Sequence, residues 1–133
     1  MLGLEIGEVA KGAVYFKSDE REHTLCYVEG DSGNQVVAFE VACRAVLPTA
    51  AGELERLGHA VQAGTSSEAA ARKSREFIAF NDPTGNRIGL VWRPANSGAR
   101  YHSSRDAGIT AFSHVGTYAP RTPRATRRSG RRC

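Results

Sequence analysis

Phe77–Arg93 reads FIAFNDPTGNRIGLVWR and contains the strongest structural signal of the sequence. It begins with a short apolar run, and its second half alternates apolar residues with others, a pattern typical of two β-strands. Between them, DPTGN combines an aspartate that can bond its own backbone with a proline that fixes φ. The glycine and asparagine that follow tolerate positive φ. The sequence therefore predicts a β-hairpin with a tight turn at Asp82–Asn86.

This hairpin resembles the D-P-x-G-N-x-hydrophobic-E-L signature that closes a βαβββ module of the vicinal oxygen chelate superfamily. That superfamily contains glyoxalase I, the bleomycin-resistance proteins and the type I extradiol ring-cleaving dioxygenases. Gln35–Ala42, QVVAFEVA, is similar to the family's H-x-A-F-x-V strand, and LGHAV at 57–61 follows a predicted helix, as it commonly does there. The resemblance is best to the N-terminal half of 2,3-dihydroxybiphenyl or catechol 2,3-dioxygenases. It implies an α+β fold of βαβββ units with a mostly antiparallel sheet.

Apolar periodicity and turn residues place the remaining elements. Pro48 suits an early helical position, Thr49 could cap the helix, and Gly58 ends it. Gly64–Lys73 is predicted to be a loop with one helical turn. The predicted strands are Lys11–Lys17, Glu22–Glu29, Gln35–Ala42 and Ala60–Ala63, and the predicted helix is Leu47–Leu57.

The two ends of the chain depart from the family pattern. In the family, L-G-L-E follows the first helix, so Met1–Glu8 implies that a first strand and most of a first helix are missing; an ordinary terminus with a short leading strand is the alternative. We expect a partial N-terminal βαβββ module at 1–93, a linker at 94–108, the first strand of a second module at 109–116 and a disordered basic tail at 117–133. The abrupt change after Gly116 favours a shifted reading frame or a truncated product.

Composition limits the class of protein. The 133 residues suffice for one domain, and no apolar run approaches the roughly 18 to 20 residues that span a bilayer. With no signal peptide, the cytoplasm is the expected location. Three cysteines without C-x-x-C spacing suggest neither disulfides nor a zinc site, and we expect Cys26 and Cys43 to be buried.

The basic excess is confined to the tail. Thr117–Cys133 holds six of the 18 Lys and Arg and no acid, so the remaining 12 face 14 Asp and Glu. The tail could attract phosphates by charge alone, but no folded nucleic-acid motif accompanies it. We therefore expect neither a nucleic-acid partner nor a membrane.

The resemblance also implies a metal chemistry. Type I extradiol dioxygenases hold Fe(II), occasionally Mn(II), with two His and one carboxylate. This chain has Val36 where the family pattern has its strand His and Gly89 where the hairpin carries its Glu, so we expect a non-catalytic module without catalytic or cofactor-binding residues. His114 falls where a second module supplies its first metal ligand, although partner ligands would lie further along such a module. Glu40 and His23 are expected to be structural or solvated.

The parent enzyme implied by the resemblance cleaves a catecholic ring with O2 at Fe(II) and assembles as a homo-oligomer. In it, this chain would be the structural module, inactive alone. Two alternatives remain: a single-module ligand-binding protein of the bleomycin-resistance type that works as a dimer, and a glyoxalase-like metalloenzyme whose site is completed between subunits.

Overall fold

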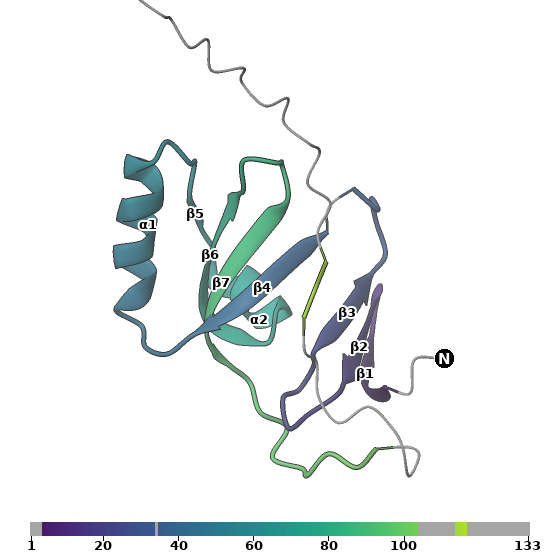
Figure 1. Ribbon diagram of the computed structural model, residues 1–133. Coiled ribbons are helices and arrows are strands. Elements are labelled where there is room, and N and C mark those ends of the chain that lie inside the picture. Colours follow the sequence, from purple (N-terminus) through teal and green to yellow (C-terminus); the bar gives the residue numbers. More distant parts are fainter. Residues whose placement is uncertain (1–3, 34, 104–113, 117–133) are drawn as a thin grey trace, which may run out of the picture.

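A computed structural model describes residues 4–33, 35–103 and 114–116, arranged as two β-sheets and two helices (Figure 1). The first sheet has the order β1-β2-β3 and the second the order β4-β7-β6-β5. Apart from one parallel pair, all neighbouring strands in these sheets run antiparallel. This is the predicted α+β class with a mostly antiparallel sheet. Among the described residues, no helix is both long and apolar enough to cross a membrane.

The first sheet is a meander of β1 (Glu5–Ala10), β2 (Ala13–Lys17) and β3 (Leu25–Val28). Gly12, with φ of +75°, closes the turn between β1 and β2, a conformation that costs glycine little. β2 and β3 lie within the strands predicted from their apolar residues. β1 overlaps Met1–Glu8, for which a short leading strand was one of the two predictions. All six residues of β1 are exposed.

The second sheet contains β4 (Val36–Val41), β5 (Gln62–Ala63), β6 (Ser74–Asn81) and β7 (Arg87–Pro94). β6 and β7 form the predicted hairpin. β4 pairs with β7 in parallel, in a register that sets Ala38 opposite Gly89. With α1 between β4 and β5, the order β-α-β-β-β is present in full from 36 to 94, with one short additional helix.

The hairpin turn is organised by Asp82. Its Oδ1 accepts hydrogen bonds from the backbone N–H groups of Thr84 and Asn86 at 2.9 and 2.8 Å, and its Oδ2 accepts one from Asn86 Nδ2 at 2.9 Å. Gly85 has φ of +91°. The DPTGN motif therefore forms the turn by the mechanism that its residue types predict.

Helix α1 (Val46–Arg56) ends as predicted at Gly58, which has φ of +89°. Two details of the prediction were wrong. Thr49 does not cap the helix, because it lies inside it and its hydroxyl donates to Ala45 O at 3.0 Å. Cys43 is exposed, because it lies in a bend on the surface two residues after the end of β4, whereas Cys26 on β3 is half-buried.

Helix α2 (Ser66–Ala71) is longer than the single turn predicted, because a capping box stabilises its start. Thr65 Oγ1 accepts from Glu68 N at 3.2 Å, and Glu68 Oε2 accepts from Thr65 N at 2.8 Å. The buried Ala69 of this helix packs against a cluster on β6 and β7, namely Phe77, Ala79 and Val91.

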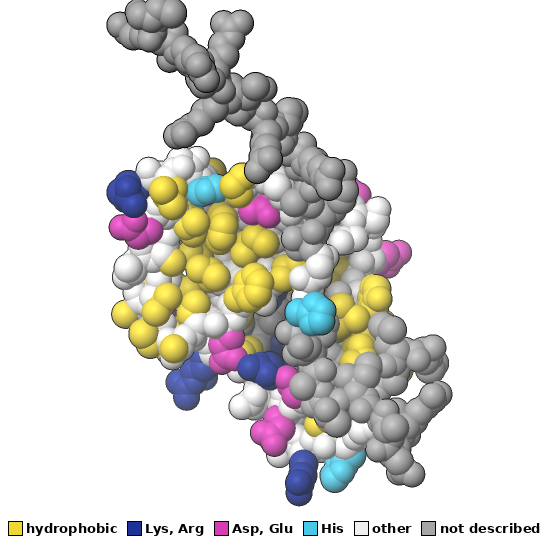
Figure 2. All heavy atoms as spheres, viewed as in Figure 1, with side chains coloured by type: hydrophobic (Ala, Val, Ile, Leu, Met, Phe, Trp, Pro, Cys, Tyr) yellow, Lys and Arg dark blue, Asp and Glu magenta, His cyan; other side chains and the backbone are white. Residues whose placement is uncertain are grey.

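The two helices cover opposite faces of the second sheet. Side chains alternate along β6, so the face of Phe77 and Ala79 meets α2, and Ile78 points to the other face. α1 packs against β6 and β7 and buries Leu47. Figure 2 shows hydrophobic side chains gathered between α1 and β4, at the edge of this second face.

Candidate functional site

The two positions at which the family pattern has metal ligands are neighbours in space. A Cβ added to Gly89 would lie 3.6 Å from Val36 Cγ1 and 3.4 Å from Ala38 Cβ. The parallel register of β4 and β7 produces this proximity, since it places residues 36, 38 and 89 on one face of the sheet. This is the face that α2 covers at β6.

The side chains at this place do not fit Fe(II). Neither Val36 nor Gly89 has a donor atom, and Ala38 beside them has none either. The carboxylate nearest in sequence belongs to Glu40, whose Oε2 is held at 2.6 Å by the guanidinium of Arg21. Arg21 also binds Asp19 at 2.7 Å, and the hydrogen bond that Arg21 donates to Glu40 is the main reason why the pKa of Arg21 is raised. Glu40 is therefore part of an ion-pair network, which agrees with the structural role expected for it.

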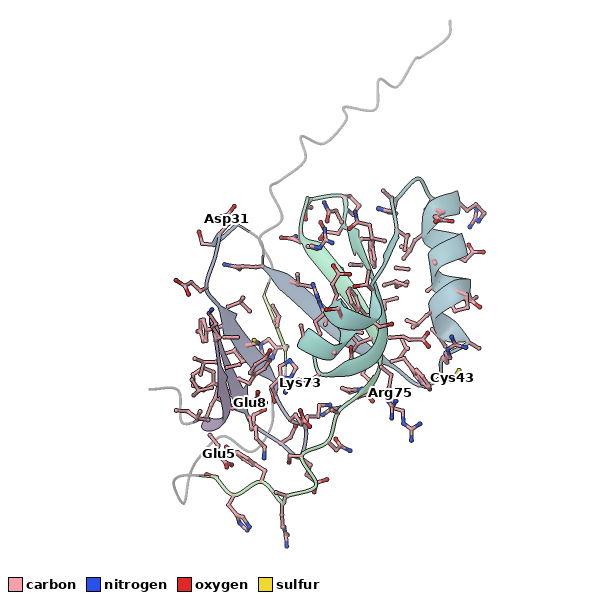
Figure 3. The ribbon with its side chains drawn as sticks, turned by 180° about the vertical axis from the view of Figure 1, so that it is seen from behind. Glu5, Glu8, Asp31, Cys43, Lys73 and Arg75 are labelled. Atoms are coloured by element: carbon pink, nitrogen blue, oxygen red, sulfur yellow. The ribbon has the colours of Figure 1, made fainter. Side chains whose placement is uncertain are left out.

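Charged groups gather instead where the two sheets meet. Lys73 Nζ lies 2.6 Å from Glu8 Oε2 and 3.6 Å from Glu22 Oε2, and it stands 5.2 Å from the centre of the Tyr15 ring. Figure 3 shows Lys73 pointing toward Glu8 on the first sheet. The buried Tyr15 donates its hydroxyl to Ala71 O at 2.9 Å. We call four residues the seam cluster: Glu8 on β1, Tyr15 on β2, Glu22 between β2 and β3, and Lys73 just before β6.

The environment of the seam cluster shifts the pKa values of nearby groups. Burial raises the pKa of Tyr15, with the nearby Cys26 adding to the effect. Burial also lowers the pKa of His23, and the positive charge of Lys73 lowers it further. His23 packs edge-on against the Tyr15 ring with the ring centres 5.2 Å apart. A neutral, half-buried imidazole in this place supports the structural role expected for His23.

A second lysine is buried at the same junction. Lys17 is only 6% exposed, and its Nζ donates to Ser97 Oγ at 3.0 Å. Ser97 in turn donates its hydroxyl to Glu20 O at 3.2 Å and its backbone N–H to the same oxygen at 3.0 Å. These bonds attach the segment after β7 to the first sheet, so Lys17 has a structural explanation. The sequence did not single out Lys17, Tyr15 and Lys73 as a group, because Lys73 is far along the chain from the other two.

The predicted ligand His114 is exposed. It belongs to the described stretch 114–116, whereas the rest of the predicted strand 109–116, like the predicted tail 117–133, lies outside the described residues. Within 4–33, 35–103 and 114–116, no group of three or more His, Cys, Asp or Glu side chains could hold a metal ion. The place of His114 as a first ligand stays a prediction.

A shallow pocket lies beside the hairpin turn and is lined by residues of β5, β6 and β7 and of the segment after α1. His59 Nδ1 is 3.0 Å from Asn81 O, and its ring packs edge-on against Phe80. Arg87 Nη2 donates to Gln62 Oε1 at 2.7 Å. Both polar side chains are thus engaged with the protein itself, and the pocket contains no pair of groups arranged for catalysis.

Superposition on solved structures shows which proteins have a fold similar to that of this chain. A catechol 2,3-dioxygenase superposes on this chain with a TM-score of 0.70 and 20% sequence identity, over 78% of this chain and 36% of the other. The chain has the fold of an extradiol dioxygenase module. 2,2',3-Trihydroxybiphenyl 1,2-dioxygenase from the dibenzofuran-degrading Sphingomonas wittichii strain RW1 gives a TM-score of 0.62 at 19% identity, over 71% of this chain and 33% of that one.

A third dioxygenase of this fold is homoprotocatechuate 2,3-dioxygenase from Brevibacterium fuscum, solved in a complex with 3,4-dihydroxyphenylacetate. It superposes with a TM-score of 0.63 at 18% identity, over 71% of this chain and 30% of its own. The chain therefore spans about a third of the length of the dioxygenases it matches. No family model matches the sequence, and no curated protein sequence matches it.

Proposed function

We propose that this chain acts as a non-catalytic structural module of an extradiol-type dioxygenase that opens catecholic rings with O2 at Fe(II). The observation that carries the proposal is the pair of positions 36 and 89. They lie side by side on one face of a dioxygenase-like sheet, yet neither side chain has a donor atom. Such a module has the scaffold of the active domain without the ability to hold its metal.

Exposed apolar side chains support a bracing role for the module. Phe39 on β4 is 56% exposed, and Tyr27 and Val28 on β3 are 60% and 71% exposed. Side chains of this size at the edges of sheets are typical of surfaces that are covered by another module or subunit. The proposal therefore includes a homo-oligomeric assembly in the cytoplasm, in which the metal is held elsewhere and His114 is a candidate first ligand of that second site.

Metal analysis tests the proposal directly. The purified chain is loaded anaerobically with Fe(II), passed over a desalting column and analysed for iron, and then mixed with catechol and O2 while the absorbance of the ring-opened product is followed. We expect no stoichiometric iron and no ring opening. Retention of one iron per chain that is lost in His114→Ala would contradict the non-catalytic assignment.

The same preparation separates the proposal from its rivals. A stable dimer on size-exclusion chromatography that binds an aromatic ligand saturably, without metal, would instead indicate a binding protein of the bleomycin-resistance type. A stoichiometric Ni or Zn per dimer would indicate a glyoxalase-like site shared between subunits. Circular dichroism of the same sample establishes that the chain is folded in each case.

A further inference from the structure

One face of the first sheet consists entirely of apolar side chains. Because side chains alternate along a strand, the register of β1, β2 and β3 assigns each residue to one of two faces. Tyr15 and Lys17 share the face that meets the second sheet, where the Tyr15 hydroxyl donates to Ala71 O. We call the opposite face the outward face. It carries six side chains, none of them charged: Ile6, Val9, Val14, Phe16, Leu25 and Tyr27.

The outward face is open to solvent at both of its edge strands. Ile6 and Val9 on β1 are 56% and 70% exposed, and Tyr27 on β3 is 60% exposed. In the middle, the Phe16 ring packs edge-on against Tyr27 with the ring centres 5.7 Å apart, so the side chains form one continuous surface. Contiguous apolar surface of this kind is typical of a site that another protein covers.

Two exposed residues of opposite charge flank one end of the outward face. Lys11 lies in the turn between β1 and β2, and Glu29 directly follows β3. The N–H of Glu29 donates to Gly12 O at 2.7 Å, so Glu29 is level with that turn. Within 4–33, 35–103 and 114–116, neither Lys11 nor Glu29 has an ion-pair partner.

We infer that two copies of this chain pack through their outward faces about a two-fold axis parallel to β2. Rotation about this axis sets β1 of one protomer over β3 of its partner, at the spacing of two packed sheets. Tyr27 of one protomer then lies opposite Val9 of the other, at the most exposed part of the face. Each contact occurs twice, as in other isologous interfaces.

The charges at the end of the sheet favour a second copy as the occupant. The axis keeps the two ends of the sheet apart, so Glu29 of one protomer lies level with Lys11 of its partner and across from it. The interface thus joins apolar surface to apolar surface and places opposite charges together at its rim. A face that satisfies both conditions with itself is complementary to its own copy.

The size of the outward face limits the strength of the dimer. Three strands about 4.8 Å apart give a width of only about 14 Å, at the small end of protein interfaces. We therefore expect a reversible dimer with a Kd on the order of 10 µM. This inference specifies the homo-oligomer of the proposed function and rests on it only in that respect. Its test uses neither metal nor substrate, so its failure would leave the metal analysis unaffected.

Sedimentation velocity of the full chain from about 1 to about 200 µM tests the inference. We expect a concentration-dependent change from monomer to dimer. Val9→Lys places a charge in the apolar face and should weaken association by at least about tenfold. Val28→Lys is the matched control, because Val28 is equally exposed, at 71%, but its side chain lies on the face of Tyr15. It should associate like the unaltered chain.

An exchange of charges tests the two-fold axis. Lys11→Glu places two carboxylates opposite each other at both ends of the axis, so we expect about fivefold weaker association at low salt. The double variant Lys11→Glu with Glu29→Lys restores opposite charges across the interface. Its affinity should return to within about twofold of that of the unaltered chain.

Three results would overturn the inference. The first is a monomer at every concentration. The second is undiminished association of Val9→Lys, which would locate self-association elsewhere, for example at the open edge of β4. The third is a double charge variant that associates no better than Lys11→Glu alone, which would refute the axis. Circular dichroism establishes the fold of each variant, and Ile6→Lys, at the other end of the face, replaces Val9→Lys if that variant does not fold.

Discussion

Lys73 Nζ lies 2.6 Å from Glu8 Oε2, although 65 residues separate the two along the chain. The pair connects the start of β6 with β1, and so it links the second sheet to the first. Lys73 has φ of +51°, an unusual conformation for a lysine, and its backbone C=O accepts from Ala95 N at 2.7 Å. The backbone of Lys73 thus prolongs the pairing of β6 with β7, and its side chain links that sheet to the first.

Replacing Lys73 tests this link. Lys73→Met retains much of the aliphatic stem and removes the ion pair and the cation above Tyr15, so we expect a loss of about 1 kcal/mol in the free energy of unfolding. Urea denaturation at low and high salt measures it, and the loss should shrink at high salt. Arg75→Met is the matched control, because Arg75 is exposed two residues away and points to the surface in Figure 3. Equal losses in both variants would contradict the link.

The carboxylate of Asp82 should make the free energy of unfolding depend on pH in the acidic range. The hydrogen bond from the Asn86 side chain, with others from Thr84, lowers the pKa of Asp82 from 3.8 to about 2. The carboxylate therefore stabilises the fold above the pKa of the unfolded chain, and this contribution is lost as pH falls from about 4 through about 2. We expect Asp82→Asn to lower the urea midpoint at pH 7, by an amount that diminishes between pH 4 and pH 2.

The control for the turn is Asp31→Asn. Asp31 accepts one backbone hydrogen bond, from Gly33 N at 2.8 Å, in the exposed segment between β3 and β4. Its substitution should cost less at pH 7 than that of Asp82, which accepts several. A pH-independent difference between Asp82→Asn and the unaltered chain would show that the charge of Asp82 plays no part.

Alanine substitutions at two glycines should have opposite effects on stability, one through steric crowding and the other through helix propensity. A Cβ on Gly64 would lie 1.9 Å from the Phe77 ring, whereas one on Gly52 in α1 would meet nothing within 4 Å. We expect Gly64→Ala to destabilise the fold by about 1 to 3 kcal/mol, since the core must shift to admit it. Gly52→Ala should stabilise it by about 0.5 to 1 kcal/mol through helix propensity. Thermal denaturation of the pair provides the comparison, and a harmless Gly64→Ala would show that Phe77 packs elsewhere.

Metal-ligand atoms can be introduced at residues 36 and 89, which share one face of the second sheet. In the double variant Val36→His with Gly89→Glu, an imidazole and a carboxylate share one face, because Cβ of residue 89 contacts Val36. We expect Co(II) to bind at least about tenfold more tightly than to the unaltered chain, a gain of roughly 1.4 kcal/mol. Titration by visible absorption measures it. In the control Val37→His with Gly89→Glu the imidazole lies on the opposite face, and equal affinity in both variants would refute the assigned geometry.

The fold was largely predictable where local chemistry decides it. The DPTGN turn fixed the β6–β7 hairpin, and Gly58 marked the end of α1. Helix α2 was underestimated although its T-x-x-E capping box, Thr65 to Glu68, is visible in the sequence. β1 could not be delimited, because Glu5–Ala10 is exposed throughout and lacks the alternation that a half-buried strand shows.

The candidate site was predictable only in part. The resemblance pointed to Val36 and Gly89, and the structure places them side by side. The seam cluster could not be found from the sequence, because Lys73 and Glu8 meet only through the packing of two sheets. Pairing between residues so far apart leaves no periodic signal.

The parallel pairing of β4 with β7 has a consequence for the order of folding. Closing the hairpin needs only the turn 82–86, whereas Val36 must reach Arg87 across α1, β5, α2 and β6. Because loop closure costs more entropy over the longer distance, the hairpin should form early and β4 should dock late. Substitutions in Asp82 would then slow refolding, while those in β4 would chiefly hasten unfolding.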